Sequence, residues 1–345
     1  MSRMLSIGLI LFACACPTIS EADAILRGAG ATFPYPLYSR WIELYQPQTR
    51  DRISYQPVGS GAGITLLIQR EVDFGGTDAF LSDEELNRAP AAILHVPTCV
   101  GAVAVIYQLP ISGLKLTPEL LADIFMGRIT RWSDKKIAQV NPSVILPQLD
   151  ITVVHRSDGS GTTFIFTDYL SKVSPSWKEK AGSGKVVKWP TGIGIEGNHG
   201  IVDLVKKIPG SISYTELAYA RKENLPAARI KNRSGNFIEP TLESASAAAE
   251  VDIPPDSRLL INDTPASHGY PIAGFSYIIL FKDQSYGRLP QDGARALARF
   301  LWWMIHEGQQ YSEQLHYSRL PERAVQTAEG VLRSVSFNGP PVLDR

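Results

Sequence analysis

Four short segments of the sequence carry small polar residues of the kind that bind an oxyanion. Each combines glycine with serine, threonine or a charged side chain at a junction between a predicted strand and a predicted helix. Glycine lets the backbone approach a ligand closely, while the unpaired N–H groups of a helix start favour negative charge. The segments are 28–33 (GAGATF), 59–63 (GSGAG), 73–78 (DFGGTD) and 156–163 (RSDGSGTT). We therefore predict that these loops bind an oxyanion.

The fourth segment contains a charge suited to a tetrahedral anion. Arg156 can direct two N–H donors at two oxygens, and its guanidinium stays charged at every relevant pH. Asp158, two residues later, could orient the guanidinium and offset the cost of burying it. The alternative is a surface Arg–Asp pair, which stabilises little and would not need the adjoining Gly-Ser-Gly-Thr.

Asp78 is unexpected here, because a carboxylate repels an anionic ligand. It fits such a site only where the ligand carries a proton that the carboxylate can accept. Phosphate carries such a proton near neutral pH, whereas sulfate is fully ionised and does not. Two facing anions in a dry site cost several kcal/mol, so a discrimination of about 10⁴ or more is feasible. We interpret Asp78 as the selectivity residue; the alternative is an N-cap for a helix near residues 81–86.

An enzyme is the competing hypothesis for loops of this kind. Ser160 lies between two glycines, but the spacing of a nucleophile elbow is absent and no partnered histidine is evident. The six histidines show no metal-ligand spacing, no Walker motif is present, and His199 is interpreted as a loop residue. We expect no catalytic residue, no metal and no cofactor. A secreted phosphatase stays the alternative from a different class.

The elements that would position these loops alternate between short apolar strands and amphipathic helices, which is typical of an α/β fold. Helical spacing of apolar side chains occurs in residues 37–45, 64–68, 120–125, 164–170 and 294–305. Buried strands are predicted for residues 100–107, 151–154 and 277–281. Residues 222–265 are richer in Asn, Ser, Pro and Ala, and we interpret them as peripheral structure. A length of 345 residues favours two domains.

Composition and the first residues indicate the partner class and the compartment. The 34 basic residues balance 34 acidic ones, so a nucleic acid partner is not indicated. Arg3, the apolar run 5–15 and the A-x-A pattern at 22–24 predict a signal peptide over residues 1–24. The run is too short for a membrane anchor, which is the alternative. Lipid attachment at Cys14 is a further alternative to cleavage before Ile25.

Cysteine usage excludes a disulfide framework in the mature chain. Cys14 and Cys16 belong to the predicted leader, which leaves Cys99 alone. Cys99 lies in an apolar setting, so we interpret it as a small core residue rather than a nucleophile.

These segments resemble the periplasmic phosphate-binding proteins of high-affinity bacterial phosphate ABC transporters. The resemblance runs from about residue 28 to the end of the chain. It is carried by GAGATFPYPLY, VDFGGTDAFLSDEEL, VVHRSDGSGTTFIFTDYL, VKWPTGIGIEGNHGI and PGSISYTELAYA. It implies phosphate ligation by Thr32, Phe33, Ser60, Asp78, Arg156, Ser160, Gly161 and Thr162, with Asp158 as the partner of Arg156. Departures at 59–63, Thr77 and His199 remove no ligand position.

The resemblance also implies the architecture and the partners. It implies an α/β, two-lobed periplasmic-binding-protein type II fold, with mixed sheets flanked by helices and a ligand cleft between the lobes. Lobe one would comprise residues 25–107 with 271–345, and lobe two residues 108–270. The partners would be inorganic phosphate and membrane permease subunits with their ATPase, and the free protein would be a periplasmic monomer. A binding protein for sulfate, molybdate or a phosphate ester is the alternative.

Overall fold

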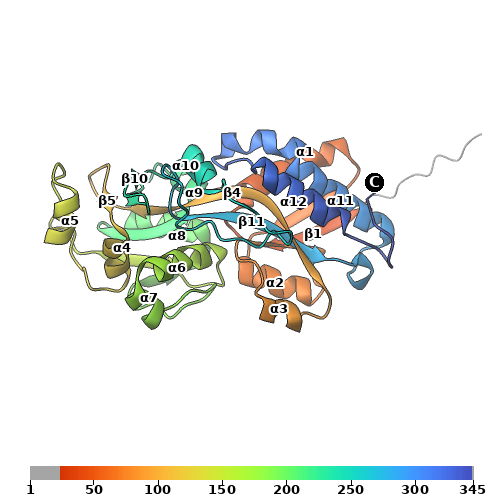
Figure 1. Ribbon diagram of the computed structural model, residues 1–345, viewed down its shortest axis with the longest axis horizontal. Helices are drawn as coiled ribbons and strands as arrows, with labels where there is room; N and C mark the ends of the chain where they lie inside the picture. Colours follow the sequence, from red (N-terminus) through yellow and green to blue (C-terminus); the bar gives the residue numbers. More distant parts are fainter. Residues whose placement is uncertain (1–23, 344–345) are drawn as a thin grey trace, which may run out of the picture.

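The computed structural model describes residues 24–343, within which eight strands form one mixed sheet. Its strand order is β2-β1-β3-β11-β4-β8-β6-β7, and it is flanked by helices on its faces (Figure 1). The strands are β1 (Ile25–Gly30), β2 (Arg52–Gln56), β3 (Phe74–Thr77), β4 (Ile93–Tyr107), β6 (Thr152–Arg156), β7 (Ile193–Ile195), β8 (Ser211–Glu216) and β11 (Ala273–Phe281). A small second sheet contains β10 (Phe237–Ile238), β9 (Arg229–Lys231) and β5 (Lys115–Leu116). The α/β fold class predicted from the sequence is confirmed.

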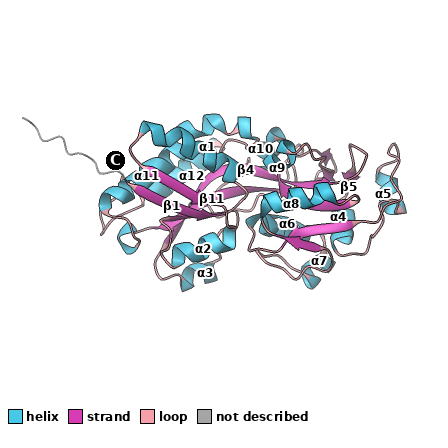
Figure 2. Ribbon diagram, turned by 180° about the vertical axis from the view of Figure 1, so that it is seen from behind, coloured by secondary structure: helices cyan, strands magenta, loops and turns pink. Residues whose placement is uncertain are grey.

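The long strand β4 belongs to both halves of the main sheet. Residues 93–102 pair antiparallel with β11, whereas residues 103–107 pair antiparallel with β8. The half that contains β1, β2 and β3 and the half that contains β6, β7 and β8 form the two lobes seen side by side in Figures 1 and 2. Nearly every residue of β4 is buried, including residues 100–107, for which the sequence predicts a buried strand.

Helices cover both lobes and follow the predicted periodicity. On the first lobe lie α1 (Tyr35–Tyr45), α2 (Ser60–Ile68), α3 (Asp83–Arg88), α11 (Gln291–Ile305) and α12 (Glu322–Arg333). On the second lie α4 (Pro118–Phe125), α5 (Lys135–Val140), α6 (Gly161–Val173), α7 (Pro175–Lys180), α8 (Gly197–Lys207) and α9 (Leu217–Lys222). Helix α10 (Leu242–Ala248) contacts β4. Short 3₁₀ helices span Gln46–Gln48, Gln284–Tyr286, Glu307–Tyr311 and Glu313–Leu315.

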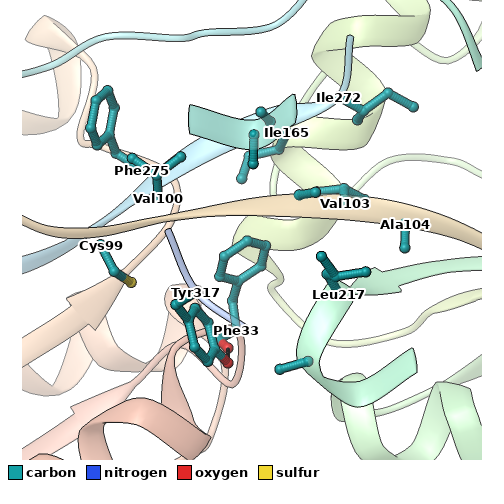
Figure 3. Packing of buried hydrophobic residues seen from close by; sticks show 14 of the residues in the cluster. Phe33, Cys99, Val100, Val103, Ala104, Ile165, Leu217, Ile272, Phe275 and Tyr317 are labelled. Atoms are coloured by element: carbon teal, nitrogen blue, oxygen red, sulfur yellow. Dashed lines mark hydrogen bonds between the residues drawn. The ribbon is translucent and has the colours of Figure 1, made fainter. Parts of the chain in front are cut away.

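The core beneath β4 holds the first predicted loop in place. Figure 3 shows Phe33 and Tyr317 packed below Val103, with Leu217 of α9 beside them. The Phe33 ring is fully buried and leaves no room for a side chain at Gly101, where a Cβ atom would lie 2.5 Å from the ring. Cys99 is fully buried in the same core, so its interpretation as a core residue is confirmed.

The segment that follows α10 contacts both lobes instead of lying at the periphery as expected. Ser257 Oγ donates a 2.6 Å hydrogen bond to the His95 carbonyl in β4, while Asn262 Nδ2 donates a 2.8 Å bond to the Ile165 carbonyl in α6. Both side chains are buried. The polar composition that indicated peripheral structure therefore reflects hydrogen bonding to neighbouring backbone, not exposure.

Within residues 24–343 no helix is long and apolar enough to cross a membrane. The predicted signal peptide, its cleavage pattern and Cys14 lie outside the described residues, except for Ala24.

Close packing of α2 against the sheet yields a stability prediction. A Cβ atom on Gly63 would lie 2.5 Å from Gly30 Cα and 2.8 Å from the Ala29 carbonyl oxygen, and both are backbone atoms that cannot move aside cheaply. We expect Gly63→Ala to lower the free energy of unfolding by ~2–3 kcal/mol. The matched change Gly330→Ala in α12 meets nothing within 4 Å and should instead stabilise the protein by ~0.5–1 kcal/mol. Urea denaturation of both variants checks this; equal effects would contradict it.

Candidate anion site between the lobes

The four predicted loops meet where the two lobes face each other. Strands β1 and β3 run parallel with Gly30 opposite Gly76, so the loops that follow them lie at one edge of the sheet. Across from them, α6 begins after β6. The Gly61 N–H donates a 2.8 Å hydrogen bond to the Gly159 carbonyl, which joins the second loop to the fourth. A Cβ atom on Gly161 would lie 2.4 Å from Ser60 Oγ, so the loops touch closely there.

Arg156 lies at the end of β6 with a side chain that is only 1% exposed. Its Nε donates a 2.6 Å hydrogen bond to Asp158 Oδ1, and its Nη2 donates to Asp158 Oδ2. The remaining nitrogen, Nη1, is buried and has no hydrogen-bond partner within the described chain. Because a buried guanidinium donor without a partner is costly, this atom is the strongest sign of a ligand between the lobes. The alternative of a surface Arg–Asp pair is wrong.

Asp158 is held in turn by the second lobe. Its Oδ1 also accepts a 3.2 Å hydrogen bond from the Gly197 N–H at the start of α8. On the other side Gly59 lies so close that a Cβ atom there would come within 2.6 Å of Asp158 Oδ2. Gly59 also has a φ of +92°, which a residue with a side chain rarely adopts. The second loop therefore needs glycine at this position for two reasons.

Asp78 follows β3 and is buried at the base of the site. Its Oδ1 accepts a 2.6 Å hydrogen bond from Ser276 of β11, and Ser60 Oγ lies 3.5 Å from its Oδ2. Burial raises the pKa of Asp78 to about 7, against the opposing effects of these hydroxyls and of the Arg156 charge. A carboxyl group with this pKa can exchange a proton near neutral pH.

The alternative role for Asp78, a helix N-cap, is wrong. Helix α3 begins at Asp83, and its cap is Ser82, whose hydroxyl accepts a 3.2 Å hydrogen bond from the Glu85 N–H. The Glu85 side chain accepts the Ser82 N–H in return, which completes a capping box. Asp78 therefore does not cap helix α3.

The first loop is fixed through its carbonyl groups. The Tyr219 hydroxyl of α9 donates a 2.6 Å hydrogen bond to the Thr32 carbonyl, and the Tyr317 hydroxyl donates a 2.6 Å bond to the Phe33 carbonyl. Both tyrosines are buried or nearly so, and burial raises the pKa of each hydroxyl, which keeps it a donor. Sequence patterns did not single out either tyrosine, because the bonds join residues 187 and 284 positions apart.

The fourth loop starts α6. Ser160 is fully buried and caps the helix, with its Oγ accepting a 3.1 Å hydrogen bond from the Thr163 N–H. Its own N–H donates a 2.9 Å bond to the Lys185 carbonyl. Gly161 and Thr162 then form the first helical turn, whose N–H groups suit an anion. Ser160 is therefore placed as a capping residue rather than an exposed nucleophile.

Asn198 is a buried polar residue of the site that the sequence did not indicate. It lies in the first turn of α8 and contacts Thr32 and Thr162, one residue from each lobe. The motif GNHG contains both Asn198 and His199. His199 is not a loop residue as expected: it lies in α8 with its side chain 77% exposed and Nε2 3.3 Å from Asp203. Consecutive residues of a helix point in different directions, so Asn198 is buried while His199 is exposed.

Direct contacts between residues of the two lobes hold the lobes together. Lys185 Nζ of the second lobe lies 2.6 Å from Glu85 Oε1 of the first, and both are partly shielded from solvent. The rings of Phe80 and Phe164 meet edge to face at 5.9 Å between centroids. Together with the Gly61–Gly159 bond these contacts describe a closed arrangement of the two lobes.

The chemistry of the site is that of recognition. It offers a fixed positive charge, hydroxyl groups, a helix start and one carboxyl group that can accept a proton. Among residues 24–343 no group of three or more His, Cys, Asp or Glu side chains is placed to hold a metal ion.

Comparison with known proteins agrees with this fold. A family model described as a PBP superfamily domain matches residues 17–307. A high-affinity periplasmic phosphate-binding protein solved at subatomic resolution superimposes with a TM-score of 0.70 at 21% identity, covering 89% of this chain and 93% of the other. A putative phosphate ABC transporter substrate-binding protein from Clostridium perfringens gives 0.64 at 19% identity, covering 86% and 100%. The chain is a member of the periplasmic-binding-protein superfamily.

Curated relatives narrow this class to one family. The phosphate-binding protein PstS of Pasteurella multocida is 40% identical over 307 residues, covering 87% of this chain and 88% of the relative. The protein of the same name from Methanocaldococcus jannaschii is 38% identical over 309 residues, covering 83% and 79%. The chain belongs to the PstS family of phosphate-binding proteins, which is a family of transport substrate-binding proteins and not an enzyme class.

The raised pKa of Asp78 has a consequence for stability. The folded state holds the proton of the Asp78 carboxyl group more tightly than the unfolded state does. The contribution of this group to the free energy of unfolding is therefore complete below pH ~4 and is lost as the pH rises towards 7. We compare the unmodified protein with Asp78→Asn, both without ligand. Between pH 4 and pH 7 the unmodified protein should lose about 2–4 kcal/mol more unfolding free energy than the variant. Urea denaturation in phosphate-free buffer measures this. Parallel pH profiles for the two proteins would contradict it.

Proposed function

We propose that this chain binds inorganic phosphate between its lobes and is the extracytoplasmic substrate-binding component of a phosphate ABC transporter. The observation that carries the proposal is the buried, unpartnered Nη1 of Arg156 in the same cleft as the Asp78 carboxyl group. Membership of the PstS family supports it. The proposed ligand groups are those of Thr32, Phe33, Ser60, Asp78, Arg156, Ser160, Gly161 and Thr162, with Asp158 orienting Arg156.

The protonation of the ligand explains why a carboxyl group belongs in this site. Arg156, the hydroxyls and the N–H groups of the α6 start supply donors, which suit the unprotonated oxygens of phosphate. Asp78 supplies an acceptor for the one oxygen that carries a proton. Sulfate has no such proton, so one of its oxygens would face the Asp78 carboxylate without a hydrogen bond. The site is therefore selective through a single acceptor among many donors.

Closure of the lobes would remove phosphate from water. We assign lobe one to residues 25–107 with 271–345 and lobe two to residues 108–270. Their relative motion would bend the chain where β4 passes from β11 to β8. Ligand contacts from both lobes favour the closed form, so binding shifts the equilibrium between open and closed.

Delivery requires partners outside this chain. We propose that the closed form docks on membrane permease subunits, whose ATPase drives release of phosphate. The chain would act in the periplasm as a free monomer after removal of its leader.

Calorimetric titration tests the function and the role of Asp78 together. Protein freed of ligand by partial unfolding and dialysis should bind one phosphate tightly and ignore millimolar sulfate. Asp78→Asn can donate a hydrogen bond to an ionised oxygen, so we expect sulfate affinity to rise by about 100-fold or more in that variant. Absence of phosphate binding by the unmodified protein would overturn the proposed function. A variant that still ignores sulfate would overturn the account of selectivity alone.

The ion pair between the lobes yields a separate prediction. Lys185 and Glu85 meet only when the lobes are closed, so Lys185→Met should destabilise the closed form and raise the phosphate dissociation rate about threefold to tenfold. Stopped-flow release of phosphate measures this rate. The control is Lys206→Met, because Lys206 pairs at 2.6 Å with Glu223 within one lobe. Equal release rates for the two variants would contradict a role for the interlobe pair.

A further inference from the structure

Asn198 is fully buried between the two lobes, and both the nitrogen and the oxygen of its side-chain amide form hydrogen bonds. Its Nδ2 donates a 2.9 Å hydrogen bond to Thr32 Oγ1 and a 3.2 Å bond to Thr162 Oγ1. Its backbone N–H also donates to Thr32 Oγ1, at 3.4 Å. Its Oδ1 accepts from Thr215 Oγ1 at 3.1 Å and from the Glu216 N–H at 3.4 Å.

The backbone fixes which way this amide group faces. The Glu216 N–H can only donate, so the atom of Asn198 beside it must be the oxygen. The amide nitrogen then necessarily faces the two threonines. Nδ2 lies 3.2 Å from Thr162 Oγ1, whereas the longer 3.5 Å contact, in which the Thr162 hydroxyl donates to Oδ1, is the weaker of the two.

These donors determine what the threonine hydroxyls can do. Thr32 Oγ1 accepts two N–H groups from Asn198, so its own hydrogen must point to another acceptor. Thr162 Oγ1 likewise accepts from Nδ2. Both residues belong to the proposed ligand set, and phosphate presents mainly acceptor oxygens. We propose that Asn198 is a positioning residue that makes the Thr32 and Thr162 hydroxyls hydrogen-bond donors to the bound anion.

Asn198 also links this orientation to closure. Thr32 comes from the first lobe, while Asn198 and Thr162 come from the second. In an open form Nδ2 would lose its bond to Thr32, and the Thr32 hydroxyl would no longer be oriented. The hydroxyl donors are therefore assembled only when the lobes meet. This inference rests on the proposed function and adds to it a residue that does not touch the ligand.

A double-mutant cycle tests the inference. Asn198→Asp keeps the shape but replaces the N–H donors by a carboxylate oxygen, so both threonine hydrogens should turn towards it and away from the anion. Thr32→Val removes the hydroxyl at nearly constant shape. We expect Thr32→Val to weaken phosphate binding about 10-fold or more in the native background, and less than about threefold in the Asn198→Asp background. Calorimetric dissociation constants for the four proteins give the coupling.

The control is Asn141→Asp, the same change at another buried asparagine. Asn141 Nδ2 donates 2.9 Å bonds to the Lys115 and Ile137 carbonyls, away from the cleft. Asn141→Asp should lower thermal stability but leave the phosphate dissociation constant within about twofold. Asn198→Ala removes the same two donors and should show coupling of the same sign, which keeps the test open if Asn198→Asp does not fold.

Three results would overturn the inference. Equal costs of Thr32→Val in the native and both Asn198 backgrounds would mean that Asn198 does not orient the hydroxyl. Loss of phosphate affinity in Asn141→Asp comparable to that in Asn198→Asp would mean that the effect is general destabilisation. Failure of the unmodified protein to bind phosphate would overturn the proposed function, and this inference with it.

Discussion

The buried guanidinium of Arg156 is the constraint on which the rest of the site depends. A buried charge is tolerated only where hydrogen bonds and an opposite charge compensate it, and Asp158 supplies both to two of the three nitrogens. The third nitrogen stays available to a ligand. Asp158 in turn requires the Gly197 N–H on one side and a glycine at position 59 on the other. The burial of Arg156 therefore limits which residues can occupy nearby positions in loops of both lobes.

The fold surrounds the Arg156 guanidinium by bringing the strand ends of one lobe close to those of the other. Strand β4 is common to both halves of the sheet, so one continuous element joins the lobes behind the cleft. The first loop is anchored by the Phe33 side chain in the core and by two tyrosine hydroxyls on its carbonyls. Asp78 is anchored by Ser276 from β11. Groups from both lobes are therefore held in fixed positions around the site.

Local chemistry allowed much of this site to be predicted from the sequence. Arg156 with Asp158 two residues away, and Asp78 shortly after the Gly75-Gly76 pair, indicate an unusual use of charge within short segments. The roles of Asn198 and of the Lys185–Glu85 pair could not be predicted in the same way. Asn198 acts through hydroxyls 166 and 36 positions away, and the ion pair joins residues 100 positions apart. Such contacts join segments that are far apart in the sequence, so no local pattern encodes them. Helical periodicity located α11 and α6 well, whereas the hydrogen-bonded segment after α10 looked peripheral because its polar residues bond to backbone.

A high-resolution crystal structure of the phosphate complex, with the positions of the anion's oxygens refined individually, would test the roles of Arg156 and Asp78 directly. We expect one phosphate between the lobes, with one oxygen within hydrogen-bond distance of Arg156 Nη1 and another within about 2.5–2.7 Å of Asp78, as for a shared proton. An anion bound elsewhere, or an Asp78 carboxyl group that contacts no phosphate oxygen, would contradict these roles.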